Sequence, residues 1–102
     1  MSSEKFTIPK DNDKLDEDIK NRKKEYMNHI FEIFVKSISE KKVLPQVNIF
    51  KFEDTNLEVI IKKAQYESNL KNLLEYMIEI EDYEKCSVIN NLLKIVEIDS
   101  KD

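Results

Sequence analysis

The sequence predicts a mainly α-helical small domain of three to four helices, with an extended or short β segment around residues 46–53 and a C-terminal αα-hairpin. Two observations support the helical class. Apolar residues recur at helical spacing over two long stretches, and glycine is absent from all 102 residues. A third observation supports the extended segment, since strand-favouring residues gather after Pro45. Without glycine, positions that need positive φ are expected to use Asn or Asp.

Residues 1–13 are expected to form a flexible N-terminal arm. Pro9 excludes helix locally, and no apolar periodicity begins within this segment. Two alternatives stay open. Phe6 anchors the arm on the core, or Phe6 and Ile8 add the arm to a partner as an edge strand.

The remainder is expected to fold as one domain, residues 14–96, followed by a flexible acidic tail, residues 97–102. The chain has no hydrophobic signal region near its start and no apolar run approaching the roughly 20 residues of a membrane helix. The lone cysteine, Cys86, favours a reducing compartment. We therefore expect a soluble, cytoplasmic protein with no membrane partner.

A first helix is predicted from Asp13 to about Lys41. Asp13 suits the N-cap position, the acidic residues after it complement the helix dipole, and Pro45 prevents continuation. The second half carries an apolar face wider than one neighbouring helix requires. That face is formed by Tyr26, Met27, Ile30, Phe31, Ile33, Phe34 and Ile38. We expect it at the centre of the core or in an oligomer interface.

Residues 43–53 are the least helical part of the domain. A strand over Val47–Phe52 needs a partner for its backbone groups. One candidate is Leu57–Lys62 in a hairpin, and the other is the same segment of a second copy.

A competing pattern begins at Thr55. The sequence Thr55-Asn56-Leu57-Glu58 matches a capping box, which predicts a helix starting near Leu57. The apolar face of that helix changes phase along the chain. Either the helix breaks or kinks near Glu67–Asn69, which a cap at Ser68 favours, or it runs on and buries different faces at its two ends.

Residues 70–96 predict two antiparallel helices joined by a very short turn. The first helix ends at the acidic Glu79-Ile80-Glu81, and the second begins at Asp82, which suits its N-cap. The apolar residues of the two helices are Leu70, Leu74, Met77, Ile78, Cys86, Ile89, Leu93 and Val96.

This hairpin resembles the UVR motif of the B and C subunits of the bacterial excision-repair nuclease and of several regulatory proteins. That motif has an acid-aromatic-glutamate turn, two small residues, and then a leucine, an Arg-Asp pair and an isoleucine. Here Asp82-Tyr83-Glu84 stands at the turn and Cys86-Ser87 in the small positions, while Ile89 and Leu93 take the two apolar ones. Asn90-Asn91 replaces the Arg-Asp pair, so any salt bridge of that pair is lost.

The resemblance covers about a quarter of the chain and implies partner binding, not DNA repair. In the family this hairpin is a docking or dimerising unit, with the turn aromatic packed at the contact. The candidate interaction residues of the hairpin are therefore Tyr83, Glu84, Leu70, Leu74 and Met77.

No catalytic, cofactor-binding or metal site is predicted. Glycine-rich phosphate loops and EF-hand loops need glycine, and one His with one Cys cannot complete a zinc site without carboxylates. His29 is expected to be a satisfied, partly buried side chain, and Cys86 an inert core residue. The net charge of −4 disfavours a nucleic-acid partner.

The leading hypothesis is a non-enzymatic interaction module, a small adaptor or regulator that docks on a protein partner of unknown identity. The alternative is a structural or assembly subunit that oligomerises through Phe31, Phe50 or Phe52. A small phage virion component is one example, since abundant Lys and Ile with one Ala and one Arg indicate an AT-rich gene. An acidic inhibitor or antitoxin-like protein is a third hypothesis, although a net charge of −4 is modest for nucleic-acid mimicry.

Overall fold

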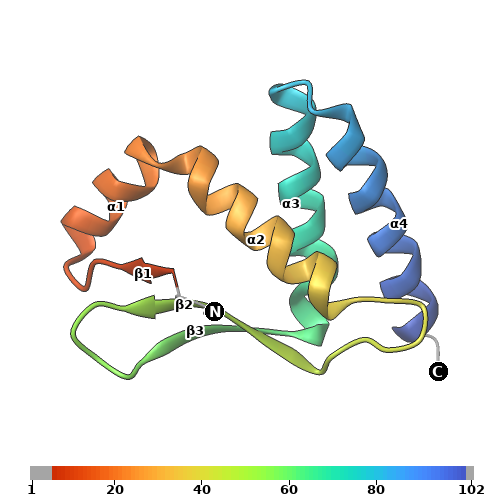
Figure 1. Ribbon diagram of the computed structural model, residues 1–102, viewed down its shortest axis with the longest axis horizontal. Helices are drawn as coiled ribbons and strands as arrows, with labels where there is room; N and C mark the ends of the chain where they lie inside the picture. Colours follow the sequence, from red (N-terminus) through yellow and green to blue (C-terminus); the bar gives the residue numbers. More distant parts are fainter. Residues whose placement is uncertain (1–5, 101–102) are drawn as a thin grey trace.

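The computed structural model describes residues 6–100 and confirms a mainly helical small domain. Within this range the chain forms four α-helices, one 3-10 turn and a three-stranded sheet. In order they are β1 (Thr7–Ile8), α1 (Asn12–Asn21), α2 (Lys23–Ser37), β2 (Gln46–Phe52), β3 (Glu58–Lys62), η1 (Lys63–Gln65), α3 (Tyr66–Glu79) and α4 (Tyr83–Ser100). The sheet runs along one side, α1 and α2 lie over it, and the α3–α4 pair stands at one end (Figure 1).

The sheet has the order β1-β2-β3. β2 and β3 form the antiparallel hairpin that was one of the two predicted pairings, with Val47 opposite Ile61. β1 pairs with β2 in parallel, with Ile8 opposite Phe52. Asp54 in the β2–β3 turn has a φ of 58°, as expected where glycine is missing.

The hydrophobic core lies where α2 crosses between the sheet and the α3–α4 pair (Figure 1). The Phe34 and Tyr66 rings meet edge to face at 5.3 Å, and the Tyr66 hydroxyl donates to the Leu44 carbonyl at 2.7 Å. The largest fully buried side chains are Tyr66, Phe34, Leu70, Leu73, Met77 and Ile89.

The prediction of one long first helix is wrong, because the helix is interrupted at Arg22, between α1 and α2. Arg22 leaves the helical region, with φ −123° and ψ 29°. The helix also ends at Ser37 rather than near Lys41, because Ile38 turns into extended backbone and forms an isolated bridge with Val43.

The helix predicted from the capping box at Thr55 is also wrong, since Glu58–Lys62 is strand β3. The Thr55 hydroxyl accepts from the Leu57 amide and donates to the Phe52 carbonyl, so it stabilises the strand-to-strand turn. The predicted break or kink near Glu67–Asn69 is wrong too, because α3 runs unbroken from Tyr66 to Glu79 and the change from strand to helix lies before it, at residues 62–66.

The ends of the chain differ from the predicted arm and tail. In place of a flexible arm, residues 7–8 form β1, Ile8 is buried and α1 begins at Asn12. α4 continues through the predicted tail to Ser100, and Asp99 pairs with Lys63 at 2.8 Å. The rest of those two segments, residues 1–5 and 101–102, lies outside the described residues. No helix of residues 6–100 is long and apolar enough to cross a membrane.

Candidate protein-interaction site at the α3–α4 turn

The turn between α3 and α4 is a Schellman motif built without glycine. The Asp82 amide donates to the Met77 carbonyl at 2.9 Å, and the Glu81 amide donates to the Ile78 carbonyl at 3.0 Å. These bonds require a left-handed residue between the helices, and Glu81 takes that place with a φ of 61°. Asn or Asp was expected at such positions, so a glutamate here is a departure.

Asp82 starts α4, as the sequence predicted. Its Oδ1 accepts from the Lys85 amide at 3.3 Å, and its carbonyl accepts from the Cys86 amide at 3.1 Å. Lys85 Nζ lies 3.3 Å from Asp82 Oδ2 and donates to Asn28 Oδ1 of α2 at 2.9 Å. The turn is therefore fixed by its backbone bonds and tied to α2 by Lys85.

A cleft of 590 Å³ lies at this turn. We call its lining the hairpin tip, and it consists of Lys24, Tyr76, Ile80, Glu81, Asp82, Tyr83 and Glu84. The Tyr83 side chain is 64% exposed and Ile80 is 42% exposed. The tip thus places an aromatic ring and an aliphatic side chain in solvent, within a rim of charged groups.

The electrostatics of the hairpin tip are acidic. Three carboxylates, those of Glu81, Asp82 and Glu84, face one ammonium group, that of Lys24. Asp82 is compensated by Lys85, which leaves Glu81 and Glu84 as exposed negative charges. This arrangement suits a partner surface with an apolar pocket beside cationic side chains.

The structure brings together two of the predicted interaction residues, Tyr83 and Glu84, and separates the others. Leu70 and Met77 are fully buried side chains of α3 and belong to the hydrophobic core, so they are not available to a partner. Leu74 and Phe31 are half-buried beside the core.

Phe50 and Phe52 lie on β2, far along the chain from the tip, and both are half-buried. Phe50 belongs to an aromatic cluster with Phe6, Tyr26 and His29, with ring centroids 5.2–5.6 Å from Phe50. This cluster includes the Phe6 contact that the sequence left open as an alternative for the arm.

Five tip residues were not among the predicted interaction residues: Lys24, Tyr76, Ile80, Glu81 and Asp82. Ile80 carried a usable signal, since it is an isolated apolar residue between two glutamates at a helix end. Lys24 lies 59 residues before Tyr83, so no local pattern could place it at the turn.

A second cleft, of 430 Å³, lies at the opposite end of α4, against the loop that follows α2. We call it the base cleft. Its main side chains are Lys41, Lys42, Val43, Lys94, Ile95 and Ile98. It joins residues about fifty positions apart in the sequence, and the sequence offered no sign of it.

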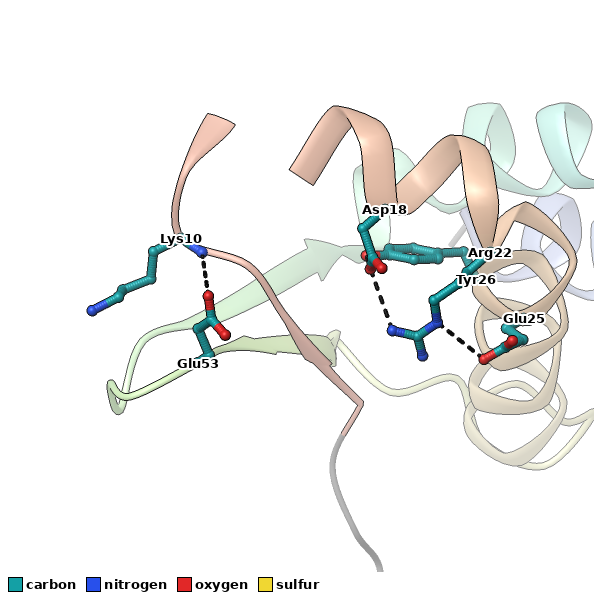
Figure 2. A network of polar contacts seen from close by, with 6 residues as sticks. All are labelled: Lys10, Asp18, Arg22, Glu25, Tyr26 and Glu53. Carbon is teal, nitrogen blue, oxygen red and sulfur yellow. Dashed lines mark hydrogen bonds and ion pairs between the residues drawn. The ribbon is translucent and has the colours of Figure 1, made fainter. Parts of the chain in front are cut away.

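A polar network joins α1 to α2 across the break (Figure 2). Arg22 bonds Asp18 at 3.3 Å and Glu25 at 3.1 Å, and the Tyr26 hydroxyl donates to Asp18. Burial, with the Asp18 hydrogen bond and charge, raises the pKa of Tyr26 far above its ordinary value. These contacts fix the angle between the helices, and we assign them a structural role. Glu53 separately accepts from the Lys10 amide, which joins the β1–α1 connection to the end of β2.

His29 and Cys86 have the environments that the sequence predicted. His29 Nε2 donates to the Ile49 carbonyl at 2.6 Å, so the ring is a satisfied, partly buried group. Cys86 is buried in the core. Among residues 6–100, no three His, Cys, Asp or Glu side chains are grouped so as to bind a metal ion.

Comparisons with known proteins add no relative: no family model, no curated protein and no solved structure matches the chain.

Proposed function

We propose that the protein is a non-enzymatic interaction module that docks on a protein partner through the hairpin tip. The observation that carries this proposal is Tyr83, an aromatic side chain 64% exposed beside a turn that two Schellman backbone hydrogen bonds close. Tyrosine is one of the residues that most often dominates binding energy at protein interfaces. We also propose that the protein acts in the cytoplasm.

The fixed geometry of the turn supports the proposal. Ordering a flexible loop opposes association, whereas a preformed surface avoids that cost. The Schellman bonds and the contact of Lys85 with Asn28 fix the backbone beside Tyr83 before any partner arrives. The resemblance to the UVR motif supports the same surface, because the aromatic residue of that motif's turn packs at the contact.

The test measures capture of partners from an extract of the cells that express the protein, quantified by mass spectrometry. Tyr83→Ala is expected to lower capture by about ten-fold or more, the effect of losing an interface hot spot. Its helical circular dichroism should stay unchanged, because the exposed ring contributes little to the core. Leu57→Ala is the matched control, since Leu57 is 66% exposed and lies in the β2–β3 turn. Equal capture by wild type and Tyr83→Ala would contradict docking through the tip.

The alternative function, an assembly subunit, has one observation in its favour. β3 is an edge strand among the described residues, and its neighbour Leu57 and its own Ile60 are exposed. Such an edge can pair with a strand of another chain. Half-burial of Phe31, Phe50 and Phe52 argues against those side chains as the assembly contact. Loss of capture or of assembly in Leu57→Ala, and not in Tyr83→Ala, would favour this alternative and a location in the virion.

A further inference from the structure

The base cleft has the chemical character opposite to that of the hairpin tip. Three ammonium groups, those of Lys41, Lys42 and Lys94, line it. Two carboxylates also line it, but Asp99 is already paired with Lys63 at 2.8 Å, which leaves Glu40. The cleft is therefore cationic, whereas the tip is anionic.

The apolar parts of the two surfaces also match. Val43 and Ile95 are half-buried in the base cleft, and Ile98 beside them is 67% exposed. The tip offers Tyr83 and Ile80 as exposed apolar side chains. A cleft of 430 Å³ is within the size range of small-molecule pockets, which exceeds the volume of a single aromatic side chain.

One chain cannot join these two surfaces to each other. Tyr83 and Ile98 lie on the same helix, 15 residues apart, which corresponds to roughly 22 Å along the helix axis. The α3–α4 turn and the C-terminal end of α4 are at opposite ends of the helix pair (Figure 1). A tip can therefore enter only the cleft of another molecule.

We propose that the partner of the hairpin tip is the base cleft of a second copy of this chain. Tyr83 enters beside Ile95 and Ile98, and the carboxylates of Glu81 and Glu84 face Lys41, Lys42 and Lys94. The proposal rests on the proposed function, because it uses the tip as the docking surface and names what the tip binds.

The geometry predicts how the copies are arranged. Tip and cleft are different surfaces, so the contact is heterologous and the copies add head to tail as a ring or an open chain. Each molecule carries a net charge of −4, which opposes association. At physiological salt this repulsion is screened beyond about 8 Å, whereas opposite charges in contact across the interface are screened much less.

The experiment uses two variants of the full chain that each lose one surface. Tyr83→Ala removes the aromatic ring of the hairpin tip and leaves the base cleft intact. Ile98→Asp replaces an apolar side chain of the base cleft by a carboxylate and leaves the tip intact. Both side chains are exposed, so both variants should keep the wild-type circular dichroism. Masses are measured by light scattering after size exclusion, up to roughly 1 mM protein, the limit for a weak contact.

The wild-type mass should rise with concentration beyond that of a dimer or settle at a closed ring, and each variant alone should be monomeric. An equimolar mixture of the two variants should form a one-to-one dimer and stop, because only one intact tip and one intact cleft remain.

Three results would overturn the proposal. One is a monomeric wild type at all concentrations. Another is a mixture of variants that stays monomeric while the wild type assembles. The third is assembly that survives both variants and is abolished by Leu57→Ala. If the wild type is monomeric and Tyr83→Ala still loses capture of a different protein, self-association is wrong and the proposed function stands.

Discussion

At the scale of single residues, the absence of glycine decides which side chains occupy the strained turns. Asp54 and Glu81 are the described residues with positive φ, and they lie in the β2–β3 and α3–α4 turns. Non-glycine residues in this region cost about 1 kcal/mol or more relative to glycine. Strain of this kind is often found at functional sites, and Glu81 belongs to the hairpin tip.

Glu81→Gly is therefore expected to raise the free energy of unfolding by about 1 kcal/mol, because glycine adopts positive φ without a steric penalty. Urea denaturation followed by circular dichroism measures the change. Glu75→Gly, at an exposed position in the interior of α3, is the control and should lower stability by about 1 kcal/mol. A destabilised Glu81→Gly would contradict the left-handed turn.

The contribution of the Tyr26 hydroxyl to stability can also be tested. Its hydroxyl donates to Asp18 from a buried ring, so Tyr26→Phe should lower the free energy of unfolding by about 1 kcal/mol at neutral pH. The folded protein keeps the phenol proton above the ordinary pKa of 10.0, whereas the unfolded chain loses it there. This contribution is thus constant below pH 10 and decreases as the pH rises further.

The measurement is the unfolding free energy of wild type and Tyr26→Phe from pH 8 to above pH 10. The difference between them should shrink, and can change sign, as the pH rises above 10, because only the wild type must keep this buried phenol protonated. Burial also raises the pKa of Tyr66, but that effect is common to both proteins and cancels. A difference independent of pH would mean that Tyr26 is accessible to solvent.

At the scale of elements, the sequence predicted the α3–α4 hairpin, which local patterns determine, better than the helix ends and strands that distant contacts determine. The α3–α4 hairpin was predicted because its apolar spacing and the Asp82 cap lie within one stretch of 27 residues. The break at Arg22 was missed because arginine has a high helix propensity. The Arg22 guanidinium stacks 4.8 Å from the Phe6 ring, a contact that no local pattern indicates.

The region after Thr55 shows two local signals in conflict. The capping box favours a helix, whereas the run Val59-Ile60-Ile61 consists of β-branched residues that favour a strand. Pairing with β2 decides the outcome, since an unpaired β2 would leave its backbone groups unsatisfied. Tertiary pairing therefore outweighs a cap of about 1 kcal/mol.

The stability contributed by strand β1 can be tested at its two residues. Ile8 is 3% exposed, so Ile8→Ala should lower the free energy of unfolding by about 2–4 kcal/mol, the effect of deleting core volume. Thr7→Ala, on the exposed side of the same strand, should change stability by less than about 0.5 kcal/mol. Urea denaturation compares the two. If both variants matched the wild type, residues 6–8 would form the flexible arm that the sequence predicted.

At the scale of the whole molecule, the sequence pointed to only two of the residues that line the candidate site. Tyr83 and Glu84 were proposed from the sequence because they are adjacent residues of one short turn, where a local pattern is enough to group them. Leu70 and Met77 shared that pattern but are buried by the helix pair itself, and helical spacing alone does not distinguish a core face from a contact face. The base cleft needs the loop after α2 to meet the end of α4, a consequence of the complete fold.

The position of the hairpin tip in the molecule leaves it accessible. The helix pair projects away from the sheet, so the α3–α4 turn lies at the end of the molecule farthest from β2 and β3 (Figure 1). The buried residues of the helix pair lie along the length of α3 and α4, whereas Ile80 and Tyr83, next to the turn, are exposed. The tip can therefore enter a partner's surface without steric conflict from the sheet.

The most direct test of docking through the hairpin tip is photo-crosslinking from position 83. A photoreactive aromatic amino acid replaces Tyr83 in one sample and Leu57, equally exposed on the β2–β3 turn, in another. Illumination in the expressing cells, followed by mass spectrometry, identifies the protein attached at each position. Docking through the hairpin tip predicts one dominant protein adduct from position 83 and little from position 57. Adducts from position 57 with none from position 83 would contradict it.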